Sequence, residues 1–408
     1  MEEYTLIIPT YQRPILLRAQ LQYLSESFAC GRVLVLDSST APAAAANAAT
    51  ARNFPFVDYR AFDSATPFAH KLLQGLRTVA TPFVSLCADD DLLFPSALER
   101  CLAEIRRRSE LSAVHGTYLH FFVPGKPPLN ISFGREYDDP SINAADAGAR
   151  LLQLFDHYES TYYAVCRTPV LRQIFEVQAD IPSLLFQELY KAACLVLSGP
   201  TLRLPDIYCA RRLDGPEATV NRRRWHPMYW AVQEGIGDFF RHYLSYRTQV
   251  LDWWRAQEPK RDPAQMEQLL DSAHYIYVQR TLLPEHLFPA AAQALGVAPT
   301  DLQRDRTGLL EGEIRALLAK NPAAIESPLM RQIRRRLNGA KLKFDQWADR
   351  RVRLRANRLG YERNDCPVVF GKTLYGAKDH PAVMAAIATV RAQVLREQKP
   401  VTPGVSAG

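Results

Sequence analysis

Short apolar segments alternate with helical segments through the first hundred residues, and this alternation most restricts the possible folds. The apolar runs are of the kind found in strands buried within a sheet. Apolar strands that alternate with helices predict a parallel sheet covered on both faces. The expected strands are residues 4–9, 32–36, 56–60 and 83–86, and the expected helices are residues 15–27, 67–79 and 96–108, with residues 41–51 either a loop or a helix.

Polar turns follow three of these strands. They are Thr10 to Arg13, Asp37 to Thr40 and Asp89 to Asp91. The carboxyl ends of parallel strands meet at one edge of a sheet, and α/β proteins bind their ligands there. We therefore expect the three turns to contribute to one binding site, and this shared location favours a functional role for the acidic turn.

The turn Asp89-Asp90-Asp91 is unusual because three adjacent carboxylates repel one another. Such a cluster at a strand end needs a cation nearby. A hard divalent ion, Mg2+ or Mn2+, that holds a nucleotide diphosphate would supply it. The alternative is a solvated acidic turn that caps the helix beginning near Pro95.

Three segments carry a resemblance to a known family. Residues 7–14 read IIPTYQRP, residues 33–40 read VLVLDSST and residues 89–95 read DDDLLFP. In this order they resemble the IPTYNRP, VVDNGST and DxDD…P segments of family 2-type glycosyltransferases with the GT-A fold. The resemblance covers about half of the chain and ends by Arg212. We thus expect an α/β fold with a GT-A-like, Rossmann-type mixed sheet and helices on both faces, followed by a mainly α-helical C-terminal domain.

The resemblance implies a donor site at the strand ends. Pro9, Thr10 and Tyr11 would line the nucleobase pocket, and Asp37 would accept hydrogen bonds from the base or ribose. Asp90 would hold the metal that bridges the donor's phosphates. The residues predicted to bind the nucleotide sugar are Pro9, Thr10, Tyr11, Arg13, Asp37, Lys71, Asp89 and Arg211, and those predicted to bind the metal are Asp90 and Asp91.

The chain departs from the family pattern at Ala88, where the first carboxylate of the DxD motif is expected. Either Asp89 and Asp91 form a shifted motif, or fewer protein carboxylates hold the metal. Cations near the diphosphate would offset its charge. The basic candidates are Lys71, Arg211 or Arg212, and the run from Arg222 to His226, which is otherwise a solvated face.

Sugar transfer to a hydroxyl needs a general base, which the resemblance places after the strand predicted over residues 160–166. Glu188, inside the helix predicted over residues 181–197, is the preferred candidate, and Asp180 is the second. The third alternative is that neither residue is the base. As a purely structural residue, Glu188 would pair with Lys191 on the helix surface. The resemblance also implies a single displacement that inverts the anomeric carbon.

At 408 residues the chain is too long for one compact core, so several domains are expected. We predict a catalytic nucleotide-sugar-binding domain over residues 1–215, an α-helical accessory domain over 216–360 and an extension over 361–408 that ends in disorder. Basic and apolar residues interleave from Arg331 to Arg358, which is typical of peripheral contact with a membrane or of a solvated helix. No nucleic-acid partner is expected.

Bulk properties complete the prediction. Seven scattered cysteines without CxxC spacing indicate reduced thiols, and no apolar run is long enough for a membrane span. We expect a cytoplasmic protein without a signal peptide, with peripheral contact at the inner membrane face. The net charge of +7 suits an anionic partner.

The predicted enzyme is a hexosyltransferase of polysaccharide biosynthesis. It would use Mn2+ or Mg2+ and transfer a sugar, from a UDP-sugar by preference, to a glycan or lipid-linked acceptor. The alternatives are a nucleotidyltransferase on a similar sheet, and a non-catalytic scaffold with a degenerate GT-A domain.

Overall fold

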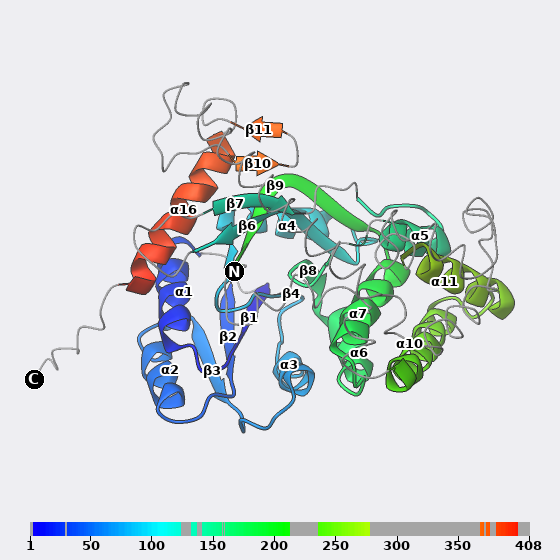
Figure 1. Ribbon diagram of the computed structural model, residues 1–408, viewed down its shortest axis with the longest axis horizontal. Helices are drawn as coiled ribbons and strands as arrows, with labels where there is room; N and C mark the ends of the chain where they lie inside the picture. The colour runs from blue at the N-terminus through cyan, green and yellow to red at the C-terminus, as the bar shows by residue number, and fades with distance from the viewer. Residues whose placement is uncertain are drawn as a thin grey trace, which may run out of the picture.

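The computed structural model describes most of the first 277 residues and a shorter part near the C-terminus (Figure 1). The described residues are 3–28, 31–123, 132–136, 141–156, 158, 160–212, 236–277, 368–370, 373–375 and 381–398. The predicted basic segment from Arg331 to Arg358, the run from Arg222 to His226 and the boundary at residue 215 lie outside them. The division into three domains therefore stays a prediction.

The described strands form one mixed sheet with the order β11-β10-β7-β6-β8-β4-β1-β2-β3, and the pair β5 and β9 adds to it at β6. This sheet and its helices confirm the predicted fold class. The strands are β1 (Tyr4–Thr10), β2 (Arg32–Asp37), β3 (Val57–Ala61), β4 (Phe83–Leu86), β5 (Leu92–Leu93), β6 (Ala113–Phe122), β7 (Ser132–Glu136), β8 (Val165–Arg167), β9 (Thr201–Arg212), β10 (Val368–Phe370) and β11 (Thr373–Tyr375).

The four N-terminal strands of the predicted alternation are parallel and bring the three polar turns together. β1 lies between β2 and β4, and Thr10 pairs with Asp37 at the ends of β1 and β2. Ile7 pairs with Leu86, so the acidic turn follows β4 at the same edge of the sheet. The apolar side chains of β1 and β2 are buried because helices cover both faces of these strands.

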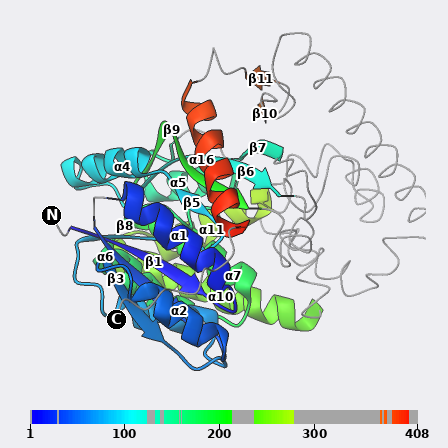
Figure 2. The same cartoon turned by 90° about the vertical axis from the view of Figure 1, so that its left-hand side faces the viewer.

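Helices lie on both faces of the parallel strands (Figure 1). α1 (Pro14–Ser27) and α2 (Ala43–Ala51) lie on one face and contact each other, and α16 (Pro381–Gln398) packs against α1 (Figure 2). α3 (Phe68–Leu76) lies on the other face, against α6 (Thr168–Gln178). α1 begins at Pro14, which fits a first helical turn because its missing N–H would have no helical partner there.

The second half of the sheet is antiparallel where it meets β4. The start of its strand β8 differs from the sequence prediction. β8 pairs antiparallel with both β4 and β6. It begins at Val165 rather than at residue 160, because residues 161–164 form a turn in which the Ala164 N–H donates to the Thr161 carbonyl at 3.1 Å. Tyr162 and Tyr163 lie within this turn rather than in the strand.

Helices from beyond residue 235 pack in the same hydrophobic core as the sheet. α10 (Ile236–Gln257) contacts α7 (Leu184–Ser198), and α11 (Pro263–Tyr277) contacts α5 (Ala147–Asp156). Trp254 of α10 and Val390 of α16 are fully buried in this core. The remaining described helix of the sheet region is α4 (Pro95–Arg107). The larger part of the predicted helical domain lies outside the described residues.

Candidate functional site

A cavity of about 620 Å3 opens at the carboxyl edge of β1 and β4. Its wall is built from the turns after these two strands, from the start of α3, from the end of α6 and the start of α7, and from the end of β9. The candidates that line it are Pro9, Thr10, Tyr11, Arg13, Lys71, Asp89, Asp90, Asp91, Glu188, Arg211 and Arg212. The structure thus brings together residues as far apart in the chain as Pro9 and Arg211.

The acidic turn is held from behind by α1. The Gln20 side-chain amide donates to the carbonyl oxygens of Ala88 and Asp91 at 2.9 and 3.0 Å. The Asp91 N–H donates to the Ala88 carbonyl at 3.2 Å, which closes the turn. Gln20 is 2% exposed, so these bonds are shielded from water. The local backbone of the triplet is therefore fixed before any ligand arrives.

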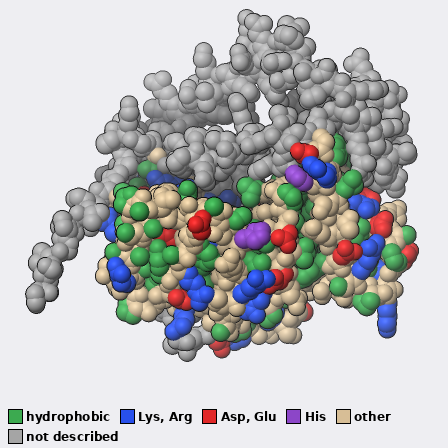
Figure 3. Space-filling model, turned by 90° about the horizontal axis from the view of Figure 1, so that it is seen from below, with side chains coloured by type: hydrophobic (Ala, Val, Ile, Leu, Met, Phe, Trp, Pro, Cys, Tyr) green, Lys and Arg blue, Asp and Glu red, His purple; other side chains and the backbone are tan. Residues whose placement is uncertain are grey.

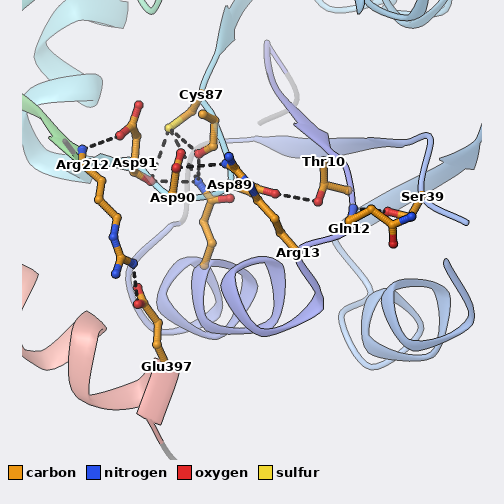
Figure 4. A network of polar contacts seen from close by, with 12 residues as sticks. Thr10, Gln12, Arg13, Ser39, Cys87, Asp89, Asp90, Asp91, Arg212 and Glu397 are labelled. Atoms are coloured by element: carbon orange, nitrogen blue, oxygen red, sulfur yellow. Dashed lines mark hydrogen bonds and ion pairs between the residues drawn. The ribbon is translucent and has the colours of Figure 1, made fainter. Parts of the chain in front are cut away.

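Each oxygen of Asp89 accepts a hydrogen bond from a residue at the end of β1 or just before α1. Thr10 Oγ1 donates to its Oδ2 at 2.6 Å, and Arg13 Nη1 donates to its Oδ1 at 3.0 Å. The same Arg13 nitrogen reaches Asp90 Oδ2 at 2.9 Å, so one guanidinium joins two carboxylates (Figure 4). Burial, followed by the charge of Asp90, raises the pKa of Asp89 to about 6, although the bonds to Thr10 and Arg13 oppose this shift.

Asp91 turns the other way, toward β9 and the turn before β8. Its Oδ2 accepts the Tyr163 hydroxyl at 2.5 Å, and its Oδ1 accepts the Arg212 N–H at 2.7 Å. The Arg212 guanidinium points away and pairs with Glu397 of α16 at 2.6 Å (Figure 4). Burial, followed by the nearby Asp90 charge, raises the pKa of Asp91 to about 7, against the opposing influence of Arg211.

The carboxylates of the triplet do not fit the predicted divalent metal in this arrangement. Each oxygen of Asp89 and Asp91 already accepts a protein hydrogen bond, and Asp90 Oδ2 is paired with Arg13. Ala88 contributes no carboxylate. Within the part of the chain that the structure describes, no group of three or more His, Cys, Asp or Glu side chains is placed to hold a metal ion.

Two further cations line the cavity. The Lys71 amine, on the first turn of α3, donates to the Thr10 carbonyl at 3.0 Å and to Ser38 Oγ at 2.9 Å. Burial lowers its pKa, while Asp37 and Asp89 oppose that change. Arg211, near the end of β9, places its guanidinium 5.9 Å from the centre of the Tyr163 ring. Both lie where the charge of an anionic ligand could be offset.

Asp37 lies below the cavity rather than on its wall. It is 1% exposed and accepts the Ser39 N–H at 2.7 Å, the Asn47 amide at 2.8 Å and the Tyr59 hydroxyl at 2.7 Å. These bonds tie the end of β2 to α2 and β3. Its predicted contact with a base or ribose stays a prediction, and the structure gives Asp37 a supporting place under the turn that carries Ser38.

Glu188 projects from α7 into the cavity and is half-buried. Its Oε1 accepts the Tyr158 hydroxyl at 3.2 Å, and the Ser160 side chain also bonds to it. Burial raises its pKa, whereas those bonds and Arg211 oppose the shift. Lys191 does not act as the surface partner considered for Glu188, because its amine is buried and donates to the carbonyls of Thr161 and Tyr162.

Asp180 lies outside this cavity, in the connection between α6 and α7. Its side chain is 77% exposed, and its Oδ1 is 3.4 Å from His70 Nε2 of α3. The two candidate bases therefore differ in position: Glu188 lines the cavity, whereas Asp180 lies outside it and faces solvent.

Several residues of the cavity wall were not among the predicted ones. They are neutral, and no charge pattern marks them: Tyr118, Ser160, Tyr162, Tyr163, Gln178 and Gln187. Gln178 is 1% exposed, and its side-chain oxygen has no hydrogen-bond partner among the residues that the structure describes. The sequence does not predict that Gln178 lines the cavity, because the surroundings of this last residue of α6 depend on how α6 and α7 pack together.

The outer surface carries both basic and acidic side chains. On the face seen in Figure 3, basic and acidic side chains intermingle. Some of the exposed side chains form ion pairs, such as Arg77 with Glu176. None of the helices in the described ranges is both long and apolar enough to cross a membrane. The predicted peripheral membrane contact falls on residues outside those ranges.

Comparisons with known proteins give similarity in structure only. No family model matches the chain, and no curated protein matches it. The S. aureus protein TarS, residues 1–349, in complex with UDP is similar at 13% identity over 68% of this chain and 72% of that one, with a TM-score of 0.47. Its complex with UDP-GlcNAc gives 14% identity over 68% and 73%, with a TM-score of 0.47.

A third solved structure is the mannosyltransferase PcManGT from Pyrobaculum calidifontis in complex with GDP-Man and Mn2+. It is 16% identical over 81% of this chain and 82% of that one, with a TM-score of 0.42.

Proposed function

We propose that this chain is a glycosyltransferase that transfers a sugar from a nucleotide-sugar donor to a hydroxyl of an acceptor. One observation carries the proposal: a single cavity at the carboxyl edge of the parallel strands is lined both by a half-buried carboxylate, Glu188, and by the cationic side chains Arg13, Lys71 and Arg211. A carboxylate that accepts a proton and cations that stabilise a leaving diphosphate are the two functions this reaction needs.

In the proposed reaction, Glu188 is the general base. The acceptor oxygen forms a bond to the anomeric carbon while the bond from that carbon to the phosphate oxygen breaks. The electron pair of the broken bond stays with the nucleoside diphosphate, and the acceptor proton passes to Glu188. A single displacement of this type inverts the anomeric carbon. Arg211 and Lys71 stabilise the charge that develops on the leaving diphosphate.

The proposed donor site lies on the β1 side of the cavity. Tyr11 is 51% exposed at its rim, so the ring is available to stack on a nucleobase, with Pro9 and Thr10 beside it. We propose a UDP-sugar as the preferred donor and a glycan or lipid-linked hydroxyl as the acceptor. The predicted Mg2+ or Mn2+ takes no part in this mechanism, because the carboxylates that would hold it are bonded to protein groups.

A donor screen tests the proposal. UDP-, GDP-, CMP- and dTDP-sugars are added to the full chain, and binding is measured by calorimetry and turnover by release of the nucleoside diphosphate. We expect one nucleotide class to bind and to be hydrolysed slowly in the absence of an acceptor. If no sugar nucleotide binds, the proposal is wrong. Binding without turnover on any acceptor would instead indicate a binding protein, and pyrophosphate release from a nucleoside triphosphate with a sugar 1-phosphate would indicate nucleotidyl transfer.

A further inference from the structure

We infer that Arg13 takes the place of a divalent cation in this site, so that the chain binds the diphosphate of its donor without a metal ion. The inference rests on the proposed function, because it concerns the same nucleotide-sugar site. It reverses the expectation drawn from the three aspartates, and it follows from how those aspartates are bonded.

Arg13 occupies the bridging position that a metal would need. Its Nη1 atom lies 3.0 Å from Asp89 Oδ1 and 2.9 Å from Asp90 Oδ2. A divalent cation bound between these carboxylates would compete with that nitrogen for the same two oxygen atoms. A guanidinium is charged at neutral pH, so Arg13 competes with the metal under the conditions of an assay.

The remaining oxygens of the two buried aspartates do not offer another metal position. Asp89 Oδ2 accepts from Thr10, and the Asp91 oxygens accept from the Tyr163 hydroxyl and the Arg212 N–H. Asp89 and Asp91 are 4% and 5% exposed. A metal at Asp91 would have to compete with the Tyr163 hydroxyl at Oδ2 or with the Arg212 N–H at Oδ1, and a displaced buried donor would be left without a partner at considerable cost.

The position of Arg13 is built into the fold. The residue follows the turn after β1, in which the Gln12 N–H donates to Ser39 Oγ at 2.7 Å. It also directly precedes α1, and its carbonyl accepts the Leu17 N–H at 3.1 Å. The Arg13 backbone is therefore held both by the turn and by the helix, and the side chain has a short path to the triplet.

Fixed cations can carry the charge of the ligand in place of a metal. Lys71 and Arg211 line the same cavity as Arg13 and come from α3 and β9. Arginine and lysine side chains stabilise phosphate charge by charge-assisted hydrogen bonds, and arginine can form two such bonds at once. Their contribution would not depend on metal concentration.

The test compares nucleotide binding with and without metal. UDP, GDP, CDP and dTDP are titrated into the full wild-type chain by calorimetry, once with EDTA and once with an excess of MnCl2. We expect the nucleotide that binds to do so in EDTA, with a Kd within about threefold of the value in Mn2+. Binding that appears only in Mn2+, or that tightens by more than about tenfold, would overturn the inference while leaving the proposed function intact. Binding of none of them in either buffer would instead count against the proposed function.

The variant Arg13→Ala sharpens the test because it releases Asp89 and Asp90 from their counter-ion. We expect its affinity in EDTA to fall by about tenfold or more, and Mn2+ to restore most of the loss. Arg13→Lys, which keeps a positive charge, should retain part of the binding in EDTA. The matched control is Arg77→Ala, which removes an exposed arginine paired with Glu176 and should change nothing. Metal-independent binding that is unchanged in Arg13→Ala would contradict the role of Arg13, and thermal melting establishes that each variant is folded.

Discussion

Two walls of the cavity differ in how completely the protein bonds its own polar groups. The strand-end wall consists of Thr10, Arg13 and residues 89–91, and every one of these side chains is bonded to another protein group. The helix wall consists of the end of α6 and the start of α7. There the buried Gln178 oxygen has no partner among the described residues, and Leu184 is 53% exposed at the rim.

The difference indicates two kinds of recognition. A wall whose charges are already paired is held in one arrangement, which suits a ligand of constant chemistry such as a diphosphate. A wall that keeps an unused acceptor and an exposed apolar side chain retains bonding capacity for a ligand that supplies hydroxyl groups and apolar surface. In the proposed reaction these are the donor and the acceptor, and Glu188 lies on the acceptor side.

The largest effect should come from the base on the helix wall. Glu188→Gln keeps the size of the side chain but removes its capacity to take a proton. We expect kcat to fall by about 100-fold to 10,000-fold while nucleotide binding changes little. Rates of donor turnover and calorimetric titrations measure the two quantities. Asp180→Asn is the matched control, because Asp180 is exposed outside the cavity. An equal loss in Asp180→Asn and none in Glu188→Gln would reverse the assignment of the base.

A second prediction concerns the pH dependence of stability on the strand-end wall. The pKa of Asp91 is about 7 in the folded chain, above its ordinary value of 3.8, so folding favours the protonated form. The stabilisation from this group is therefore complete below about pH 4 and is lost as the pH rises through 7. We expect Asp91→Asn to reduce the loss of unfolding free energy between pH 4 and pH 8 by about 2–4 kcal/mol.

Denaturant unfolding of the wild type and of Asp91→Asn at a series of pH values measures this difference. The matched control is Asp58→Asn, which alters an aspartate whose side chain is 55% exposed. Parallel pH profiles for the wild type and Asp91→Asn would show that Asp91 is not held protonated by burial.

A smaller effect should come from the ion pair that joins β9, next to the strand-end wall, to α16. Arg212, whose N–H holds Asp91, pairs with Glu397, and both side chains are at most 14% exposed. We expect Glu397→Ala to lower the unfolding free energy by about 1–3 kcal/mol. Glu176→Ala should cost much less, because solvent screens its exposed pair with Arg77. Equal losses in the two variants would mean that burial adds nothing to the α16 contact.

The contrast between the walls also explains how far the sequence could predict the structure. The strands and helices of the first hundred residues follow from local apolar spacing, and the shared sheet edge of Thr10 and Asp89 follows from their positions after parallel strands. The predicted position of Glu188 on a helix depends on the same local pattern. These features need only the residues near each position in the chain.

The pairing of groups within the site depends on contacts that a single sequence does not reveal. Arg13 meets Asp89 across 76 positions of the chain, and Arg212 meets Glu397 across 185. Asp37 has the sequence context of a ligand-binding residue, but its neighbours Asn47 and Tyr59 bond to it from other elements. The acidic triplet therefore predicts a need for positive charge and leaves open whether an ion or an arginine supplies it.

The last prediction compares two buried glutamines, one behind the strand-end wall and one on the helix wall. The Gln20 side-chain oxygen also has no partner among the described residues, but its amide donates to two carbonyls behind the acidic turn, so Gln20→Leu should lower the unfolding free energy by about 1–3 kcal/mol. The Gln178 oxygen has no partner among the described residues, so Gln178→Leu removes a group that is costly to bury. We expect that variant to be as stable as the wild type or more stable by up to about 1 kcal/mol, but to transfer sugar about fivefold less efficiently to an acceptor found in a hydroxyl-compound screen. Chemical denaturation and kcat/KM for that acceptor measure the two effects. Destabilisation of Gln178→Leu equal to that of Gln20→Leu would mean that the helix wall is held together by its own bonds, like the strand-end wall, and does not reserve Gln178 for a ligand.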